Sequence, residues 1–195
     1  YNVNSPIIFP KLKEKVKKNG KNECRPICIF NLKDRIILSL TNKFLTRLLD
    51  EQFQDSSFAF RSKRNSQGII LSHHDCIAGI KEFRNSNSSK ELFVAECDMK
   101  KFYDTVNHKI ALELFHSLIE TAKLKYPTIN LETPRKIFES YLNSFAFNLN
   151  IPKETDIKYW EAYNITNGFF GWIDEDTLKT NYTHIYNERI GVPQG

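Results

Sequence analysis

Residues 93–108 decide the fold, and they have the sequence FVAECDMKKFYDTVNH. The apolar run over 91–98 ends in the carboxylate of Asp98, and an aromatic-rich turn follows before Asn107 opens a helical pattern. This order predicts a largely buried strand over 91–98 with Asp98 at its exposed end. A carboxylate in that position can hold a hard divalent cation, with a backbone carbonyl as a second oxygen ligand. A lone aspartate after a strand can equally cap the next helix.

Charge is unevenly distributed along the 195 residues, whose formal net charge is +5. Residues 1–65 contain 14 Lys or Arg and 6 Asp or Glu, a balance of +8, whereas residues 66–195 contain 14 and 17, a balance of −3. This asymmetry predicts that the front of the chain meets a polyanion. No apolar run reaches the length of a membrane span. We therefore expect a soluble, cytoplasmic protein without a membrane partner.

The front of the chain predicts a basic β-hairpin. A short strand over 7–11 leads into a lysine-rich stretch, a turn signal lies at Asn19-Gly20, and the alternating pattern of 24–30 predicts the returning strand. A plain edge hairpin that lysines protect from aggregation is the alternative.

Helices are predicted where apolar residues recur every three or four positions. Such patterns run over 34–53 and 69–83, and further helices begin at Asn107 and at Thr133-Pro134. Between them, 53–64 is predicted as a loop. Residues 148–187 mix polar and aromatic residues and predict a small hairpin whose strands, 163–166 and 169–173, turn at Asn167-Gly168.

The four cysteines lack the paired spacing of a metal site and are predicted to be reduced thiols. A contact between Cys24 and Cys28, or zinc binding by His73, His74 and Cys76, is left open by the sequence.

Four segments together resemble one family. The stretch around Asp98 closely resembles the first catalytic motif of reverse transcriptases, especially the bacterial branch with group II intron, retron and phage-defence enzymes. Residues 25–36, with Arg25-Pro26-Ile27 and Asp34-Arg35-Ile36, are similar to the fingers segment of intron-type enzymes. Residues 57–61 (SFAFR) are similar to the next block, and 191–195 (GVPQG) to the loop beside the incoming nucleotide. The resemblance covers roughly residues 7–116 and 189–195.

The resemblance implies an α+β right-hand polymerase. Residues 1–90 would form the fingers, a basic hairpin plus helices. Residues 91–195 would begin the palm, with an insertion at about 148–187. Both ends look like cuts in a longer protein. The family's second catalytic carboxylate hairpin is expected beyond residue 195, so this fragment is expected to be inactive alone.

The same resemblance implies roles for single residues. Asp98 would bind the catalytic Mg²⁺, with the carbonyl of Met99 contributing, and Tyr103 would exclude ribonucleotides as a steric gate. The remaining contacts to the nucleotide would come from Lys11, Arg25, Gln194 and Gly195, and contacts to nucleic acid from Arg61, Lys63 and Arg64. The plainer alternatives are core packing for Tyr103 and an ion pair with Glu23 or Asp34 for Arg25. Asp104 is predicted to be structural.

The implied activity is addition of deoxynucleotides to a primer 3′-hydroxyl, directed by an RNA template, through two-metal phosphoryl transfer. The implied partners are an RNA template, a DNA or RNA primer, deoxynucleoside triphosphates and an associated non-coding RNA. Three alternatives remain at this point. The first is template-independent or protein-primed synthesis in a phage-defence enzyme, the second a catalytically dead RNA-binding relative, and the third an unrelated basic binding module.

Overall fold

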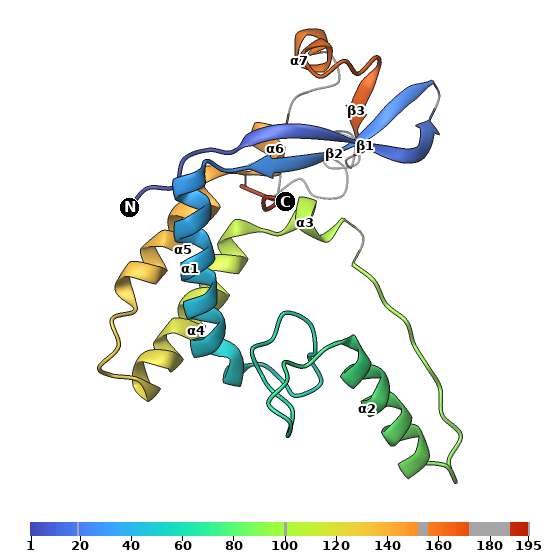
Figure 1. Cartoon of the computed structure of the whole chain (residues 1–195), viewed down its shortest axis with the longest axis vertical. Coiled ribbons are helices and arrows are strands. Elements are labelled where there is room, and N and C mark those ends of the chain that lie inside the picture. Colours follow the sequence, from blue (N-terminus) through green and yellow to red (C-terminus); the bar gives the residue numbers. More distant parts are fainter. Residues whose placement is uncertain (19, 100, 152–155, 172–187, 195) are drawn as a thin grey trace.

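The computed structural model describes residues 1–18, 20–99, 101–151, 156–171 and 188–194. In this part of the chain a small sheet lies above a group of packed helices, and one further helix stands apart (Figure 1). The elements in chain order are β1 (Ile7–Lys18), β2 (Lys21–Ile29), α1 (Leu32–Leu49), the 3₁₀ turn η1 (Asp50–Gln52), α2 (His73–Ser86), α3 (Phe102–Thr105), α4 (His108–Lys125), α5 (Glu132–Ser144), α6 (Phe147–Asn150), α7 (Ile157–Ala162) and β3 (Gly168–Phe170).

The predicted hairpin is confirmed as β1 and β2, which pair antiparallel with Lys11 opposite Arg25. Gly20 takes a positive φ of 76° in the turn, which a glycine adopts without steric cost. Side chains alternate along β2, so Cys24 and Cys28 are buried while Arg25 is exposed. All four cysteines are free thiols.

Helix α1 confirms the predicted helix over 34–53, with η1 as its last turn. Its N-terminus is capped by Asn31, whose side chain accepts from the backbone N–H of Asp34 at 2.9 Å. Asp34 is fully buried, and its carboxylate accepts from the Tyr1 hydroxyl, from Asn4 and from Asn31. These bonds attach the first residues of the chain to the start of α1.

The main core lies where α1, α4 and α5 pack side by side (Figure 1). The Phe115 and Phe138 rings stack at 4.0 Å between α4 and α5. The buried members of this core are Leu45, Leu48, Leu49, Phe115, Ile119, Ala122 and Leu131. They come from α1, α4 and the connection before α5, and Phe138 of α5 packs against them, so no single element of this core can bury its apolar side chains alone.

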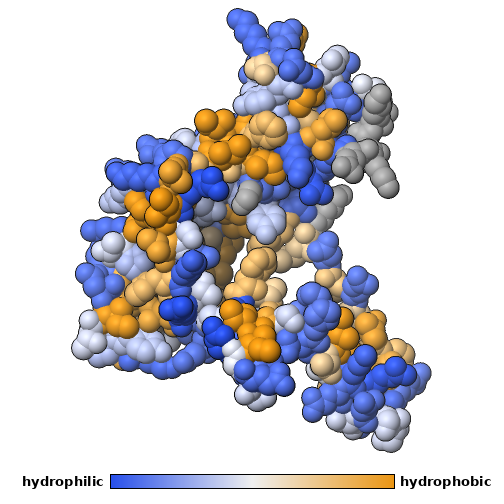
Figure 2. All heavy atoms as spheres, viewed as in Figure 1, coloured by the Kyte–Doolittle hydropathy of each residue, from blue (hydrophilic) through white to orange (hydrophobic). Residues whose placement is uncertain are grey.

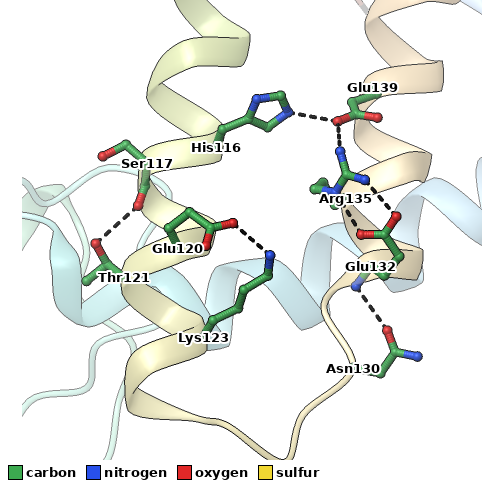
Figure 3. Close-up of polar contacts among 9 residues, drawn as sticks. All are labelled: His116, Ser117, Glu120, Thr121, Lys123, Asn130, Glu132, Arg135 and Glu139. Carbon is green, nitrogen blue, oxygen red and sulfur yellow. Dashed lines mark hydrogen bonds and ion pairs between the residues drawn. The ribbon is translucent and has the colours of Figure 1, made fainter.

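Polar contacts join α4 and α5 on the outside of the core (Figure 3). His116 Nε2 lies 2.7 Å from Glu139 Oε1, and Arg135 donates to both Glu132 and Glu139. The hydrogen bonds from Arg135, and then from Lys136, lower the pKa of Glu132 to about 2. These groups are exposed or only partly buried, so salt screens them and they add little to stability.

Near the centre of the chain the predicted buried strand is wrong, and the predicted helix is present as α2 but with a shifted start. Residues 91–99 are extended, but in the described part of the chain no strand pairs with them, and Phe93 and Val94 are 86% and 96% exposed. A strand is buried only when neighbouring strands or helices cover it. The predicted helix over 69–83 begins later, at His73 after the Ser72 cap, and none of its residues is buried. Figure 2 shows orange, hydrophobic side chains at the surface of this part.

Two boundaries further along also differ from prediction. Helix α5 begins at Glu132, whose N–H is bonded by Asn130, rather than at a Thr133 cap. Residues 163–166 form turns instead of a strand, because the N–H groups of Asn164 and Ile165 bond back to α7. Strand β3 therefore pairs not with them but parallel with β2. Residues 172 and 173 of the predicted hairpin lie outside the described residues.

No described helix combines the length and the apolar composition that crossing a membrane needs.

Candidate functional site

A pocket of about 860 Å³ lies between the β1–β2 hairpin, the turn into α3 and the loop over 188–194. Five of the residues predicted to contact nucleotide or metal line it, and they come from three separate segments: Arg25, Asp98, Met99, Tyr103 and Gln194. The structure adds others that the sequence did not single out for this site, among them Lys13, Asp104, Phe170 and Gly171.

Strand β2 presents Arg25 to the pocket on the exposed face of the hairpin. The alternative ion pairs for Arg25 are not formed, since Glu23 pairs with Lys13 and Asp34 is enclosed by hydrogen-bonding partners. Within the described part of the chain Arg25 has no carboxylate partner, and a guanidinium in that state suits recognition of an anionic ligand such as phosphate.

A lysine of β1 also reaches the pocket, and it is Lys13 rather than Lys11. Lys11 lies opposite Arg25 in the hairpin, is exposed, and is not part of the lining. Lys13 lies two residues further along β1 and forms an ion pair with the mostly buried Glu23. Strand alternation places Lys11 and Lys13 on one face, so the choice between them needed the three-dimensional position of the pocket.

The turn between the extended segment and α3 places Asp98, Met99 and Tyr103 around the pocket. Lys101 has a positive φ of 58°, which reverses the chain just before α3 begins. Tyr103 is 47% exposed, and its ring packs edge-on against Phe102 at 5.6 Å. The core-packing alternative for Tyr103 therefore does not hold in this structure.

The loop over 188–194 joins the hairpin to this turn through its backbone. Gly191 N–H donates to the Val106 carbonyl at 2.8 Å, and Val192 N–H donates to the Tyr103 carbonyl at 2.7 Å. On the other side, the Gln194 carbonyl accepts from Cys28 N–H at 2.6 Å. The loop thus fixes the distance between β2 and α3, the two walls of the pocket.

Gly191 is required where this loop passes α3. Its φ of 84° disfavours any side chain, and a Cβ would lie 2.8 Å from the Asp104 carbonyl oxygen and would overlap Phe147. Gly195, the glycine that sequence reasoning selected, lies outside the described residues.

Two titratable groups support the loop. His108 is buried and its Nε2 lies 2.7 Å from the Gly191 carbonyl. Burial lowers the pKa of His108, and because a carbonyl only accepts, the neutral ring carries its proton on Nε2. Burial raises the pKa of Asp104, which Lys101 and the hydrogen bond from Gln194 partly oppose. The sequence positions of His108 and Asp104 did not predict that either residue contacts this loop.

The residues predicted to contact nucleic acid have different surroundings. Arg61 is buried, and its guanidinium donates to Asp50 and to the carbonyls of Gln54 and Ser57. Arg61 is therefore enclosed by the protein instead of open to a template. Removing one partner of such a buried ion pair lowers the free energy of unfolding by about 3–5 kcal/mol. Lys63 pairs with the exposed Asp55, and Arg64 donates to the Gly68 carbonyl.

The pocket lining contains oxygen groups of the kind that bind hard cations. Asp98 is exposed and the Met99 carbonyl follows it, so both can offer the oxygen ligands that Mg²⁺ prefers. Asp104 is the second carboxylate of the lining. In the described ranges no group of three or more His, Cys, Asp or Glu could hold a metal, which applies also to His73, His74 and Cys76.

Cations, two carboxylates and an amide around an open pocket define a class of site, one that takes an anionic ligand carrying hydrogen-bonding groups. Comparison with family models identifies the family: residues 16–195 match the model described as reverse transcriptase (RNA-dependent DNA polymerase). The chain therefore belongs to the reverse transcriptase family, whose domain is built as polymerase fingers and palm. Searches of curated proteins and of solved structures each return no match.

Proposed function

We propose that this chain forms the nucleotide-binding side of an RNA-directed DNA polymerase. The observation that carries the proposal is the convergence of Arg25, Asp98, Tyr103 and Gln194 on one pocket from segments up to about 170 residues apart. Family membership supports the general activity and its partners, an RNA template, a primer and deoxynucleoside triphosphates. The finer roles below are part of the proposal.

The hairpin binds the triphosphate. Arg25 and Lys13 lie on the wall opposite the α3 turn; Arg25 makes the main phosphate contact through its guanidinium, since Lys13 already pairs with Glu23. Tyr103 lies beneath the sugar and excludes a 2′-hydroxyl by steric overlap. Asp98 and the Met99 carbonyl are the ligands that would hold Mg²⁺. When bound, Mg²⁺ neutralises phosphate charge and activates the attacking 3′-hydroxyl.

The test is Asp98→Asn in the natural protein that carries this chain, assayed for incorporation of labelled dNTP on an RNA template with a DNA primer. Loss of the only carboxylate proposed as a metal ligand here should lower incorporation by roughly three orders of magnitude, about 4 kcal/mol. Because Asp98 is exposed, the melting temperature should not change. If the variant retains incorporation within tenfold of the parent protein, the proposal that Asp98 is a metal ligand is wrong.

Glu120→Gln on the outer face of α4 is the matched control, since it makes the same change of carboxylate to amide away from the pocket. The sequence of the DNA product also distinguishes template-directed synthesis from the template-independent alternative. Synthesis that follows the template supports the proposal, whereas products independent of the template indicate the defence-type alternative.

A further inference from the structure

Helix α1 carries a row of apolar side chains on the side that faces away from the core. Its buried leucines, Leu45, Leu48 and Leu49, pack with α4 and with the connection before α5. Four other apolar side chains recur at every fourth residue and are between 39% and 71% exposed: Leu32, Ile36, Leu40 and Phe44. Side chains four positions apart lie above one another on a helix, so this row, the α1 ridge, is continuous over about three turns.

The exposed side of α1 is also positively charged. Its exposed cations are Lys33, Arg35, Lys43 and Arg47. The one carboxylate of this helix, Asp34, is fully buried. At about 100° of rotation per residue, Lys43 and Arg47 fall within the same sector as the α1 ridge. Neither forms an ion pair within the described part of the chain. Apolar and cationic groups are therefore interleaved on one face of α1.

This interleaving distinguishes three kinds of partner. A nucleic acid would use the cations, but its phosphates and sugars gain little from aliphatic side chains. Helices that bind a membrane surface separate an apolar face from a cationic one, whereas Lys43 and Arg47 lie within the ridge sector. A second amphipathic helix uses both kinds of group, since its apolar row packs against the ridge and its carboxylates pair with the cations.

We propose that the α1 ridge is the docking surface for an amphipathic helix of a partner protein, one whose apolar row is flanked by acidic side chains. Rows of side chains four positions apart are the ridges that interlock in the commonest class of helix packing, in which the two axes cross at about 50°. The inference does not depend on the proposed function, because no residue of the ridge lines the pocket around Arg25 and Asp98.

The experiment uses the natural protein that carries this chain and a displayed library of helical peptides of 18 residues, the length of α1. Leucine is fixed at every third or fourth position of the peptides, and the flanking positions vary among Glu, Gln and Lys. Selection on the protein should enrich Glu at the flanking positions. Fluorescence anisotropy of a labelled selected peptide then gives its dissociation constants for the parent protein and for variants.

Two variants test the two parts of the surface. Leu40→Ser removes an apolar side chain from the middle of the ridge and should weaken binding of the selected peptide about tenfold. The double variant Lys43→Glu with Arg47→Glu should bind the acidic peptide more weakly, and should bind its counterpart with Lys in place of Glu more tightly. The changed side chains are exposed, so the melting temperature should stay at the parental value.

Leu114→Ser is the matched control, because it makes the same change at an equally exposed leucine. Leu40 and Leu114 are 62% and 63% exposed, both lie on helices of 18 residues, and Leu114 is on α4, outside the ridge. This control should bind the selected peptide as tightly as the parent protein does.

Three results would overturn the inference. The first is a selection without enrichment of Glu, and the second is a selected peptide whose affinity Leu40→Ser leaves unchanged. The third is a different occupant of the ridge: no peptide is selected, while Leu40→Ser weakens binding to an RNA hairpin or to phosphatidylglycerol vesicles, or converts a parental dimer to monomers. Incorporation of dNTP is not part of the readout, so a failure of the proposed function is seen separately.

Discussion

Tyr103 shows how a single residue acquires its role from the backbone around it. The side chain follows Asp98 by five positions, and the positive φ of Lys101 turns the chain between them so that both face one pocket. The backbone of Tyr103 is fixed by Val192 of the loop, which leaves its half-exposed ring beside the pocket. Arg61 illustrates the opposite case, since a charged residue in a family-like segment proves to be enclosed.

We predict that Tyr103→Ala reduces discrimination against ribonucleotides. Removing the ring opens the space that a 2′-hydroxyl would occupy, so the ratio of kcat/KM for dNTP to that for rNTP should fall at least tenfold. Single-nucleotide incorporation with matched dNTP and rNTP measures the ratio. Tyr103→Phe keeps the ring and should keep the ratio; an unchanged ratio in Tyr103→Ala would show that another group excludes ribonucleotides.

At the scale of elements, the third strand shows how a segment distant in sequence completes the hairpin. β3 pairs parallel with β2 through Asn22, Glu23 and Cys24, and the N–H of Asn22 also bonds to the Asn167 carbonyl at 2.9 Å. Trp160 and Phe170 pack on Cys24, and the hydroxyl of Tyr159 donates to the Ile8 carbonyl. The segment predicted as an insertion in the palm thus contacts the predicted fingers.

We predict that Gly168→Ala destabilises this contact. The added Cβ would overlap the Trp160 ring, which is 4% exposed and cannot move away freely. Overpacking of this kind costs about 1–3 kcal/mol, and chemical denaturation of parent and variant measures it. Because Phe170 lines the pocket, the KM for dNTP should rise as well.

Gly79→Ala is the matched control for this prediction. A Cβ at Gly79 meets only Phe58, at an ordinary 3.7 Å, and alanine favours a helix, so stability should be unchanged or slightly higher. Equal unfolding free energies for Gly168→Ala and the parent would mean that β3 and α7 do not pack on the hairpin as described.

For the whole molecule, two buried carboxylates connect distant parts of the chain. Asp34 attaches the first residues to α1, and Asp50 attaches the loop around Arg61 to the end of the same helix. Burial alone would raise both pKa values. Hydrogen bonds outweigh it, from Tyr1, Asn4 and Asn31 to Asp34 and from Arg61 and Ser62 to Asp50, and they hold both pKa values below the ordinary range.

We predict that stability falls in acid because of these two groups. In the unfolded chain an aspartate has a pKa of about 3.9. The pKa values of Asp34 and Asp50 in the folded protein are lower than this. The stability that the two carboxylates contribute is therefore fully present above the unfolded pKa and is lost as the pH falls through the folded pKa values. Melting temperatures between pH 7 and pH 3 measure the loss. Asp34→Asn should be less stable at pH 7 and less pH-dependent below pH 4, whereas Glu120→Gln should match the parent.

Much of the fold was predictable from the sequence because its signals are local. Apolar spacing predicted α1 and α4, the Asn19-Gly20 turn predicted the hairpin, and Asn107 marked the start of α4 by its capping side chain. The motif residues that line the pocket were also found from the sequence, since their order along the chain resembles that of the family. The helix, turn and cap signals depend on neighbours within a few positions, so they need no knowledge of the tertiary structure.

The tertiary structure decided the rest, because burial and pairing depend on partners far away in the chain. It placed Lys13 instead of Lys11 at the pocket, enclosed Arg61, paired β3 with β2 and left 91–99 without a described strand partner. The sequence by itself determined which chemical groups are available and in what order. Only the fold determined that Asp104 and Gln194 meet, since a hydrogen bond across 90 residues leaves no periodic pattern in the chain.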